Sequence, residues 1–199
     1  MLPLLARYGL RAVFAVPVAS QSAEHRGDHL VPLEHWKEVC VRGGHELAAH
    51  GVTHTSLTSL TDGALHTELA ASQKATAATT LVYPGGAHDD RVAAAAAQYF
   101  RAARTTRRGF EQLPPRDPFR LRTFVARKGT YRVWLWNLRA AWAALTNRWL
   151  IECYHNVSLG RDADDGRRHT VPLDALEKHL AFLKRLPIRI APLRDIVHP

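Results

Sequence analysis

The chain of 199 residues has few of the features that mark disulfide-bonded, thiolate-metal or membrane-spanning proteins. Its two cysteines, Cys40 and Cys153, lie far apart in apolar segments and belong to no C-x-x-C motif. We therefore expect buried thiols, and neither a disulfide framework nor a thiolate metal site. No apolar run approaches the roughly 18 residues that span a membrane. No linker rich in proline, glycine or serine divides the sequence, which predicts one domain over residues 1–199.

Acidic residues are also scarce. The chain has 18 aspartates and glutamates against 27 lysines and arginines, which gives a formal charge of +9. The excess is concentrated between Arg101 and Arg148, where only Glu111 and Asp117 are acidic. These arginines are dispersed among alanines and leucines and accompany no nucleic-acid recognition motif. We therefore expect no nucleic-acid partner and interpret the excess as a solvated basic face or a surface for anionic glycans.

The N-terminal segment has some features of a secretion signal. Arg7 and Arg11 precede an apolar run over residues 12–19, but the run is short and Pro17 interrupts it. We interpret residues 11–16 as a buried strand of the mature fold. The sequence therefore does not indicate a cellular location.

Helical and strand patterns alternate along the whole chain. Helices are predicted at residues 2–8, 32–42, 61–75, 88–99, 131–147 and 172–185, and strands at residues 10–16, 46–49, 80–83, 100–104, 150–154 and 188–191. This order predicts an α/β fold with parallel strands and crossover helices, either a barrel or a doubly wound sheet. In both cases functional residues are expected at the carboxyl ends of the strands.

Two histidines four residues apart, His50 and His54, follow the predicted strand 46–49. Neutral imidazole is a good ligand for zinc and similar ions, so the pair is a candidate metal site that needs one or two further donors. His45 and Glu46 do not form a zincin motif, because the next histidine comes five residues after the first and no helix is predicted there. Polar or glycine-rich segments follow three other strands, at residues 83–86, 104–106 and 155–156. Their convergence on one rim indicates an enzyme.

Three strings resemble the motifs of one enzyme family. Residues 44–54, Gly-His-Glu-Leu-Ala-Ala-His-Gly-Val-Thr-His, are similar to the motif G-H-E-[IL]-x-x-H-x-x-x-H. Residues 81–86, Leu-Val-Tyr-Pro-Gly-Gly, are similar to R-x-P-[YF]-G, with Val82 and Gly85 replacing the usual arginine and aromatic residue. Residues 151–155, Ile-Glu-Cys-Tyr-His, stand where the family has a late strand ending in histidine. The order and spacing resemble the polysaccharide deacetylases of the NodB homology domain, carbohydrate esterase family 4, over essentially the whole chain.

The resemblance implies a distorted, incomplete (β/α) barrel of the NodB type. It also implies a metal-dependent hydrolase that removes N-linked acetyl groups from an amino sugar in a glycan or glycolipid. The histidines that match His50 and His54 bind a divalent ion in this family, and zinc is the expected ion here. The amide that matches Gly85 helps to hold the oxyanion, and the histidine that matches His155 donates a proton to the leaving amine. The implied partner is an N-acetylated carbohydrate.

The chain departs from the family at the first motif, T-F-D-D-G, which supplies the general base and a third metal ligand. No such string occurs in the sequence, so we expect an N-terminally truncated domain without its first strand, in which residues 11–16 have one unpaired edge. Asp89-Asp90 opens a predicted helix and is interpreted as a cap, and Asp164-Asp165 is placed in a polar loop.

Three functional hypotheses follow. The first is a deacetylase that lacks its first strand here. The second is a family member that has lost catalysis and acts as a carbohydrate-binding module, because two histidines without the aspartates would hold zinc weakly. The third is a basic protein that binds an anionic glycan or membrane surface.

Tryptophans gather in and just after the predicted helix 131–147, at Trp134, Trp136, Trp142 and Trp149. Three arginines nearby would suit peripheral contact with a membrane, namely Arg132, Arg139 and Arg148. We favour the interpretation that the tryptophans pack in the core and rim of the fold. The remaining histidines show no constellation, and they include His25, His29, His66, His88, His169 and His179.

Overall fold

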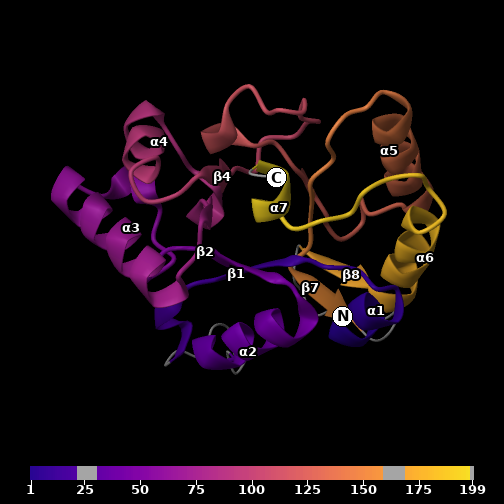
Figure 1. Ribbon diagram of the computed structural model, residues 1–199, viewed down its shortest axis with the longest axis horizontal. Helices are drawn as coiled ribbons and strands as arrows, with labels where there is room; N and C mark the ends of the chain where they lie inside the picture. The colour runs from indigo at the N-terminus through magenta and orange to yellow at the C-terminus, as the bar shows by residue number, and fades with distance from the viewer. Residues whose placement is uncertain (22–30, 159–168, 198–199) are drawn as a thin grey trace. The chain divides into compact units, whose positions relative to one another are not determined.

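The computed structural model describes residues 1–21, 31–158 and 169–197 (Figure 1). Four strands form one parallel sheet in the order β1-β2-β3-β4. Their bounds are β1 Val13–Val16, β2 Glu46–Ala49, β3 Thr80–Val82 and β4 Ala102–Arg104. In register, Leu81 lies opposite both Ala49 and Ala103. Because the strands are parallel, their carboxyl ends share one edge of the sheet.

Each crossover between these strands contains a helix with recognisable end signals. The three helices are α2 Leu33–Gly43, α3 Asp62–Thr76 and α4 Asp90–Ala96. The residue after α2, Gly44, has φ 64°, the left-handed conformation that commonly ends a helix. Thr61 Oγ1 accepts a hydrogen bond from the Ala64 amide at the start of α3, and Asp89 accepts one from the Val92 amide at the start of α4. These caps confirm the predicted starts of both helices.

The chain divides into two units, which we describe separately. Unit 2 comprises residues 11–106, 117–121 and 191–199 and holds the four-stranded sheet. Its core is mainly aliphatic, with Leu65, Leu69, Leu81 and Val92 all at most 1% exposed. Unit 1 comprises residues 1–10, 107–116 and 122–190. The prediction of a single domain over residues 1–199 stays a prediction.

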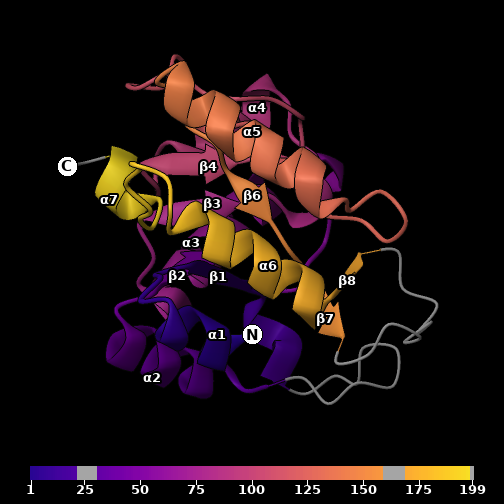
Figure 2. The ribbon, with the colours of Figure 1, turned by 90° about the vertical axis from the view of Figure 1, so that its right-hand side faces the viewer.

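Unit 1 contains two further pairs of parallel strands and two long helices. β5 (Phe124–Val125) pairs with β6 (Glu152–Cys153), and β7 (Asn156–Ser158) pairs with β8 (Thr170–Pro172). The helices α5 (Val133–Leu145) and α6 (Leu173–Leu183) lie side by side (Figures 1 and 2). Trp136 of α5 is 2% exposed and packs in a cluster with Tyr131 and Val171.

The remaining helices are short. They are α1 Leu2–Arg7, α7 Arg194–Val197, and the 3₁₀ turns η1 Val18–Gln21, η2 Leu57–Ser59, η3 Pro84–Gly86 and η4 Pro118–Arg120. Among the described residues, no helix is both long and apolar enough to cross a membrane.

The predicted α/β order is confirmed for most elements, and none of the three sheets formed by the described residues closes on itself, as expected of an incomplete barrel. Val13–Val16 is a strand, as expected, and its edge away from β2 has no strand partner within residues 1–21, 31–158 and 169–197. The strand predicted at residues 188–191 is wrong. That segment forms no strand, and prolines stand on both sides of it, at Pro187 and Pro192, where they limit ladder pairing. The pairing of β7 with β8 was not predicted.

A buried carboxyl group links β2, β3 and α7 within unit 2. Glu46 is 1% exposed, and its carboxylate accepts hydrogen bonds from the Thr80 hydroxyl and from the Arg194 amide, the latter at 2.9 Å. Burial raises the pKa of Glu46, and the hydrogen bonds from Thr80 and Arg194 oppose that rise only in part. The charged form is therefore disfavoured in the native state relative to the unfolded state.

The raised pKa of Glu46 determines how this residue's contribution to the free energy of unfolding changes with pH. A carboxyl group whose native pKa is raised contributes stability that is fully present below its unfolded pKa and is lost as the pH rises through the native pKa. Glu46→Gln keeps the size of the side chain and one acceptor oxygen, and it removes the charge. We expect urea unfolding to show this variant gaining stability relative to the native chain as the pH is raised from acid to neutral. A difference that is constant with pH, or one of opposite slope, would contradict this account of Glu46.

Candidate active site

The structure brings the two predicted metal ligands together at the carboxyl end of β2. The His50 and His54 rings have centroids 4.7 Å apart and planes inclined at 73°. Two imidazoles bound to one tetrahedral zinc ion have centroids roughly 5 Å apart, so the observed spacing suits a shared ion. His54 has φ 60°, a left-handed conformation that few residues with a side chain adopt. The loop therefore holds His54 in an uncommon backbone geometry next to His50.

A backbone carbonyl of the neighbouring strand selects the tautomer of the neutral His50 ring. The His50 Nδ1 atom lies 2.7 Å from the carbonyl oxygen of Val82, the last residue of β3. A carbonyl oxygen only accepts hydrogen bonds, so Nδ1 carries the hydrogen and the neutral ring has its lone pair on Nε2. Histidine ligands of metal ions commonly donate their other ring N–H to a carbonyl in this way. The contact depends on the backbone of Val82, so its valine side chain does not disturb it.

A glutamate of α3 holds the loop between the two histidines. Glu68 Oε1 accepts hydrogen bonds from the Val52 amide at 2.7 Å, the Thr53 amide at 2.9 Å and the Thr53 hydroxyl at 3.1 Å. Gly51 has φ 75°, and a Cβ atom there would lie 3.1 Å from the same oxygen. Glycine at 51 thus allows the carboxylate to approach the loop. Glu68 is not identifiable from the sequence, because nothing in its local pattern distinguishes it from a surface glutamate.

The pair could supply two of the nitrogen donors that a metal site needs. Within the part of the chain that the structure describes, no third histidine, cysteine, aspartate or glutamate gathers with them. The ring spacing and the His50 tautomer suit a divalent ion, and a four-coordinate ion would take its other ligands from water, substrate or a further residue. Asp164 and Asp165 lie outside the described residues.

A tight turn, η3, follows β3 and lies against the segment that follows β4 at the same edge of the sheet. Gly85 has φ 62°, is exposed, and would meet no atom within 4 Å if it carried a Cβ. Gly86 has φ 79°, and a Cβ there would lie 2.2 Å from Thr106 Oγ1, so the two segments touch through a position that only glycine can occupy. Thr105 is fully buried, and its hydroxyl donates to the Leu121 carbonyl. Residues 105 and 106 therefore serve packing, while the surface at Gly85 is open.

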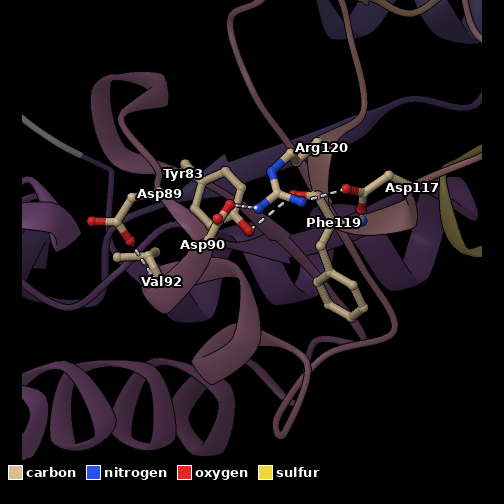
Figure 3. Close-up of polar contacts among 7 residues, drawn as sticks. All are labelled: Tyr83, Asp89, Asp90, Val92, Asp117, Phe119 and Arg120. Carbon is tan, nitrogen blue, oxygen red and sulfur yellow. Dashed lines mark hydrogen bonds and ion pairs between the residues drawn. The ribbon is translucent and has the colours of Figure 1, made fainter.

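The Asp89-Asp90 pair acts as a helix cap and a surface ion pair (Figure 3). Asp89 Oδ1 accepts from the Val92 amide at 2.7 Å, as predicted for a cap. The exposed Asp90 side chain pairs with Arg120 at 2.6 Å, and Arg120 also pairs with Asp117 at 2.5 Å. Both carboxylates thus have structural partners, which confirms the predicted cap.

The predicted proton donor lies in unit 1. His155 is exposed and lies two residues after the end of β6, and its ring centroid lies 4.7 Å from that of His169. His169 Nδ1 lies 3.4 Å from the Ala126 carbonyl oxygen. The register of β7 with β8 places Asn156 opposite Thr170, so the two histidines precede paired residues of neighbouring strands. The catalytic role of His155 stays a prediction.

A second histidine of unit 1, His179, has polar partners that the sequence does not indicate. His179 is fully buried, and its Nε2 lies 3.0 Å from both carboxylate oxygens of Glu152. Its Nδ1 lies 2.7 Å from Asn137 Oδ1, so both ring nitrogens have acceptors. The Tyr154 hydroxyl also donates to Glu152, and burial, with the negative charge of Glu152 adding to it, raises the pKa of Tyr154. The interpretation of His179 as a histidine without a constellation is therefore wrong.

The sequence profile of the polysaccharide deacetylases matches residues 1–101. The chain belongs to the polysaccharide deacetylase family. The matched residues include the histidine pair, the β3 turn with Gly85 and the Asp89 cap, and the resemblance predicted from the motifs is confirmed.

Solved structures show that the fold is that of the polysaccharide deacetylases. A protein of Mycobacterium smegmatis assigned to these enzymes is 14% identical, with a TM-score of 0.63 over 98% of this chain and 73% of that chain. The Bc1960 peptidoglycan N-acetylglucosamine deacetylase is 15% identical, with a TM-score of 0.53 over 98% and 78%. The deacetylase PplD of Streptococcus pyogenes is 22% identical, with a TM-score of 0.52 over 62% of this chain and 57% of that chain. The chain thus spans little more than half of the length of PplD. No curated protein sequence matches this member of the polysaccharide deacetylases.

The role of Glu68 yields a test. Glu68→Ala removes the acceptor for two amides and a hydroxyl, so the loop between the histidines loses its fixed geometry. We expect this variant to bind Zn²⁺ about 10- to 100-fold more weakly, as measured by competition with a chromophoric chelator. Glu68→Gln keeps one acceptor oxygen and should fall between this variant and the native chain.

The matched control is Glu38→Ala, which removes an exposed helical glutamate that pairs with Arg42. This variant should keep the native affinity for zinc. Equal zinc affinities in Glu68→Ala and the native chain would show that Glu68 does not position the histidines.

Proposed function

We propose that this polysaccharide deacetylase is a metal-dependent hydrolase that removes N-linked acetyl groups from an amino sugar in a glycan or glycolipid. The observation that carries the proposal is the imidazole pair at the carboxyl edge of the sheet. His50 has its Nε2 lone pair set by the Val82 carbonyl, and His54 lies beside it. We assign both histidines as ligands of a divalent ion, with zinc the ion that suits two imidazoles.

The remaining steps of amide hydrolysis are assigned to other residues of this chain. A divalent ion, when bound, supplies a Lewis acid for the acetamide carbonyl and lowers the pKa of a bound water. Water adds to the carbonyl carbon and gives one proton to a base other than the residues named above. The Gly85 N–H donates to the resulting oxyanion, a role that its exposed, unobstructed turn supports. The C–N bond then breaks to give acetate and a free amine. His155 gives its proton to the departing nitrogen, a role that rests on its match to the family motif.

A second candidate function is a carbohydrate-binding module without catalysis. It is favoured by a specific observation: within residues 1–21, 31–158 and 169–197 no carboxylate joins the two histidines. The two candidates differ in one respect. The hydrolase needs a carboxylate or an equivalent base near the ion, and the module needs only the sugar surface.

Metal titration tests the ligand assignment. We expect the chain to bind one zinc ion, and His50→Ala and His54→Ala each to weaken binding at least about tenfold, because each removes one of few protein ligands. Binding should also weaken as the pH falls below about 6.5, where free imidazoles become protonated. His35→Ala, which changes an exposed histidine of α2, is the matched control and should bind zinc as the native chain does. Unchanged affinity in both His50 and His54 variants would refute the assignment.

Acetate release separates the two candidate functions. The zinc-loaded chain is incubated with N-acetylglucosamine oligomers, and free acetate and oligosaccharide binding are measured in parallel. Release that is lost in the His50→Ala/His54→Ala double variant and reduced in His155→Ala supports the hydrolase. Oligosaccharide binding with no acetate release in the native chain would favour the binding module instead.

A further inference from the structure

The helix α5 of unit 1 exposes a stripe of large apolar side chains. Trp134 is 66% exposed, Leu138 58%, Trp142 55% and Leu145 85%. At 100° per residue these four positions fall within an arc of about 80° on one side of the helix and extend along it for about 16 Å. We call these four residues the α5 stripe. The expectation that the tryptophans of this region pack in the core and rim of the fold agrees with the buried Trp136 and is wrong for Trp134 and Trp142.

The opposite side of α5 is also apolar, and it is buried. Trp136, Ala140 and Ala143 are between 2% and 7% exposed and face the interior of unit 1. A helix that packs on one side normally carries polar residues on the other, because exposed aromatic and aliphatic groups cost hydration free energy. α5 is apolar on both sides, so the packing of unit 1 does not explain the α5 stripe. A cluster of this kind on a protein surface marks an interaction site.

The charges around the α5 stripe indicate the partner. Residues 118–151 contain seven lysines and arginines and no aspartate or glutamate. Exposed cations stand at both ends of the helix, with Arg127 and Arg132 before it and Arg148 after it. The guanidinium group of Arg139 lies 4.6 Å from the centroid of the Phe124 ring, so this charge is held on the flank of the helix. Exposed tryptophan and leucine bordered by arginine is the composition of helices that lie in the headgroup region of anionic bilayers.

We propose that α5 docks this protein on an anionic lipid bilayer. Trp134 and Trp142 lie at the headgroup level, Leu138 and Leu145 contact the acyl chains, and the arginines contact lipid phosphates. The leucines distinguish this partner from a glycan, since sugars stack on aromatic rings and gain little from aliphatic side chains. The proposal is independent of catalysis, because it uses none of the residues assigned to the metal site or to proton transfer.

Vesicle flotation tests the docking. The full 199-residue chain is mixed with vesicles of phosphatidylcholine alone, or of phosphatidylcholine with phosphatidylglycerol. We expect binding to the anionic vesicles that weakens with added NaCl, and a Trp134→Ser/Trp142→Ser variant that binds them at least about tenfold more weakly. Val41→Ser is the matched control, because it removes an apolar side chain of α2 that is more exposed than either tryptophan (Val41 is 83% exposed) and should leave binding unchanged.

Further readouts distinguish the outcomes. Brominated acyl chains should quench native tryptophan emission more than that of the variant, and circular dichroism should show that both are folded. Failure of the native chain to bind anionic vesicles, or equal binding by the folded Trp134→Ser/Trp142→Ser variant, would overturn the proposal. The proposal would also be overturned if the native chain bound no vesicles but formed a lipid-free dimer or a glycan complex, and if the Trp134→Ser/Trp142→Ser variant did not form that dimer or complex. Acetate release does not enter these readouts, so loss of catalysis and loss of docking are distinguishable.

Discussion

The hydrogen bond between the His50 imidazole and the Val82 carbonyl is the contact on which the candidate active site depends. It exists because β2 and β3 are adjacent parallel strands, so the first residue after one strand lies beside the last residue of the other. By placing the hydrogen on Nδ1, this bond puts the lone pair of the neutral ring on Nε2, the atom that would bind the ion in the proposed function. Glu68 and Gly51 then fix the loop that places the His54 ring beside the His50 ring. The sheet, the loop and the α3 carboxylate thus together position the His50 and His54 rings.

Much of this arrangement could be predicted from the sequence, because it depends on residues that lie close together in the chain. The spacing of His50 and His54, the cap at Asp89 and the glycine after α2 are short-range patterns that determine backbone geometry within a few residues. The parts that could not be predicted depend on residues distant in the chain. Glu68 reaches a loop 15 and 16 residues away, and any residue at position 82 would offer the same carbonyl.

The errors have physical causes of the same kind. Residues 188–191 are apolar enough for a strand, but pairing depends on a neighbouring strand edge and on the prolines at 187 and 192. Trp134, Trp136 and Trp142 all lie on a helix that is apolar around most of its circumference, so periodicity does not identify the buried side. The network of His179, Glu152 and Asn137 joins three separate elements, and no spacing rule connects them.

The central claim is that His50 and His54 are poised as metal ligands by the fold itself. Nitrogen-15 NMR of the histidine rings during a zinc titration tests it most directly, because the ring shifts report which nitrogen carries a hydrogen and which one binds the ion. The account predicts that His50 of the metal-free chain is protonated on Nδ1, and that zinc shifts Nε2 of His50 together with a ring nitrogen of His54. Protonation of His50 on Nε2 in the metal-free chain, or zinc that leaves both rings unchanged, would contradict it.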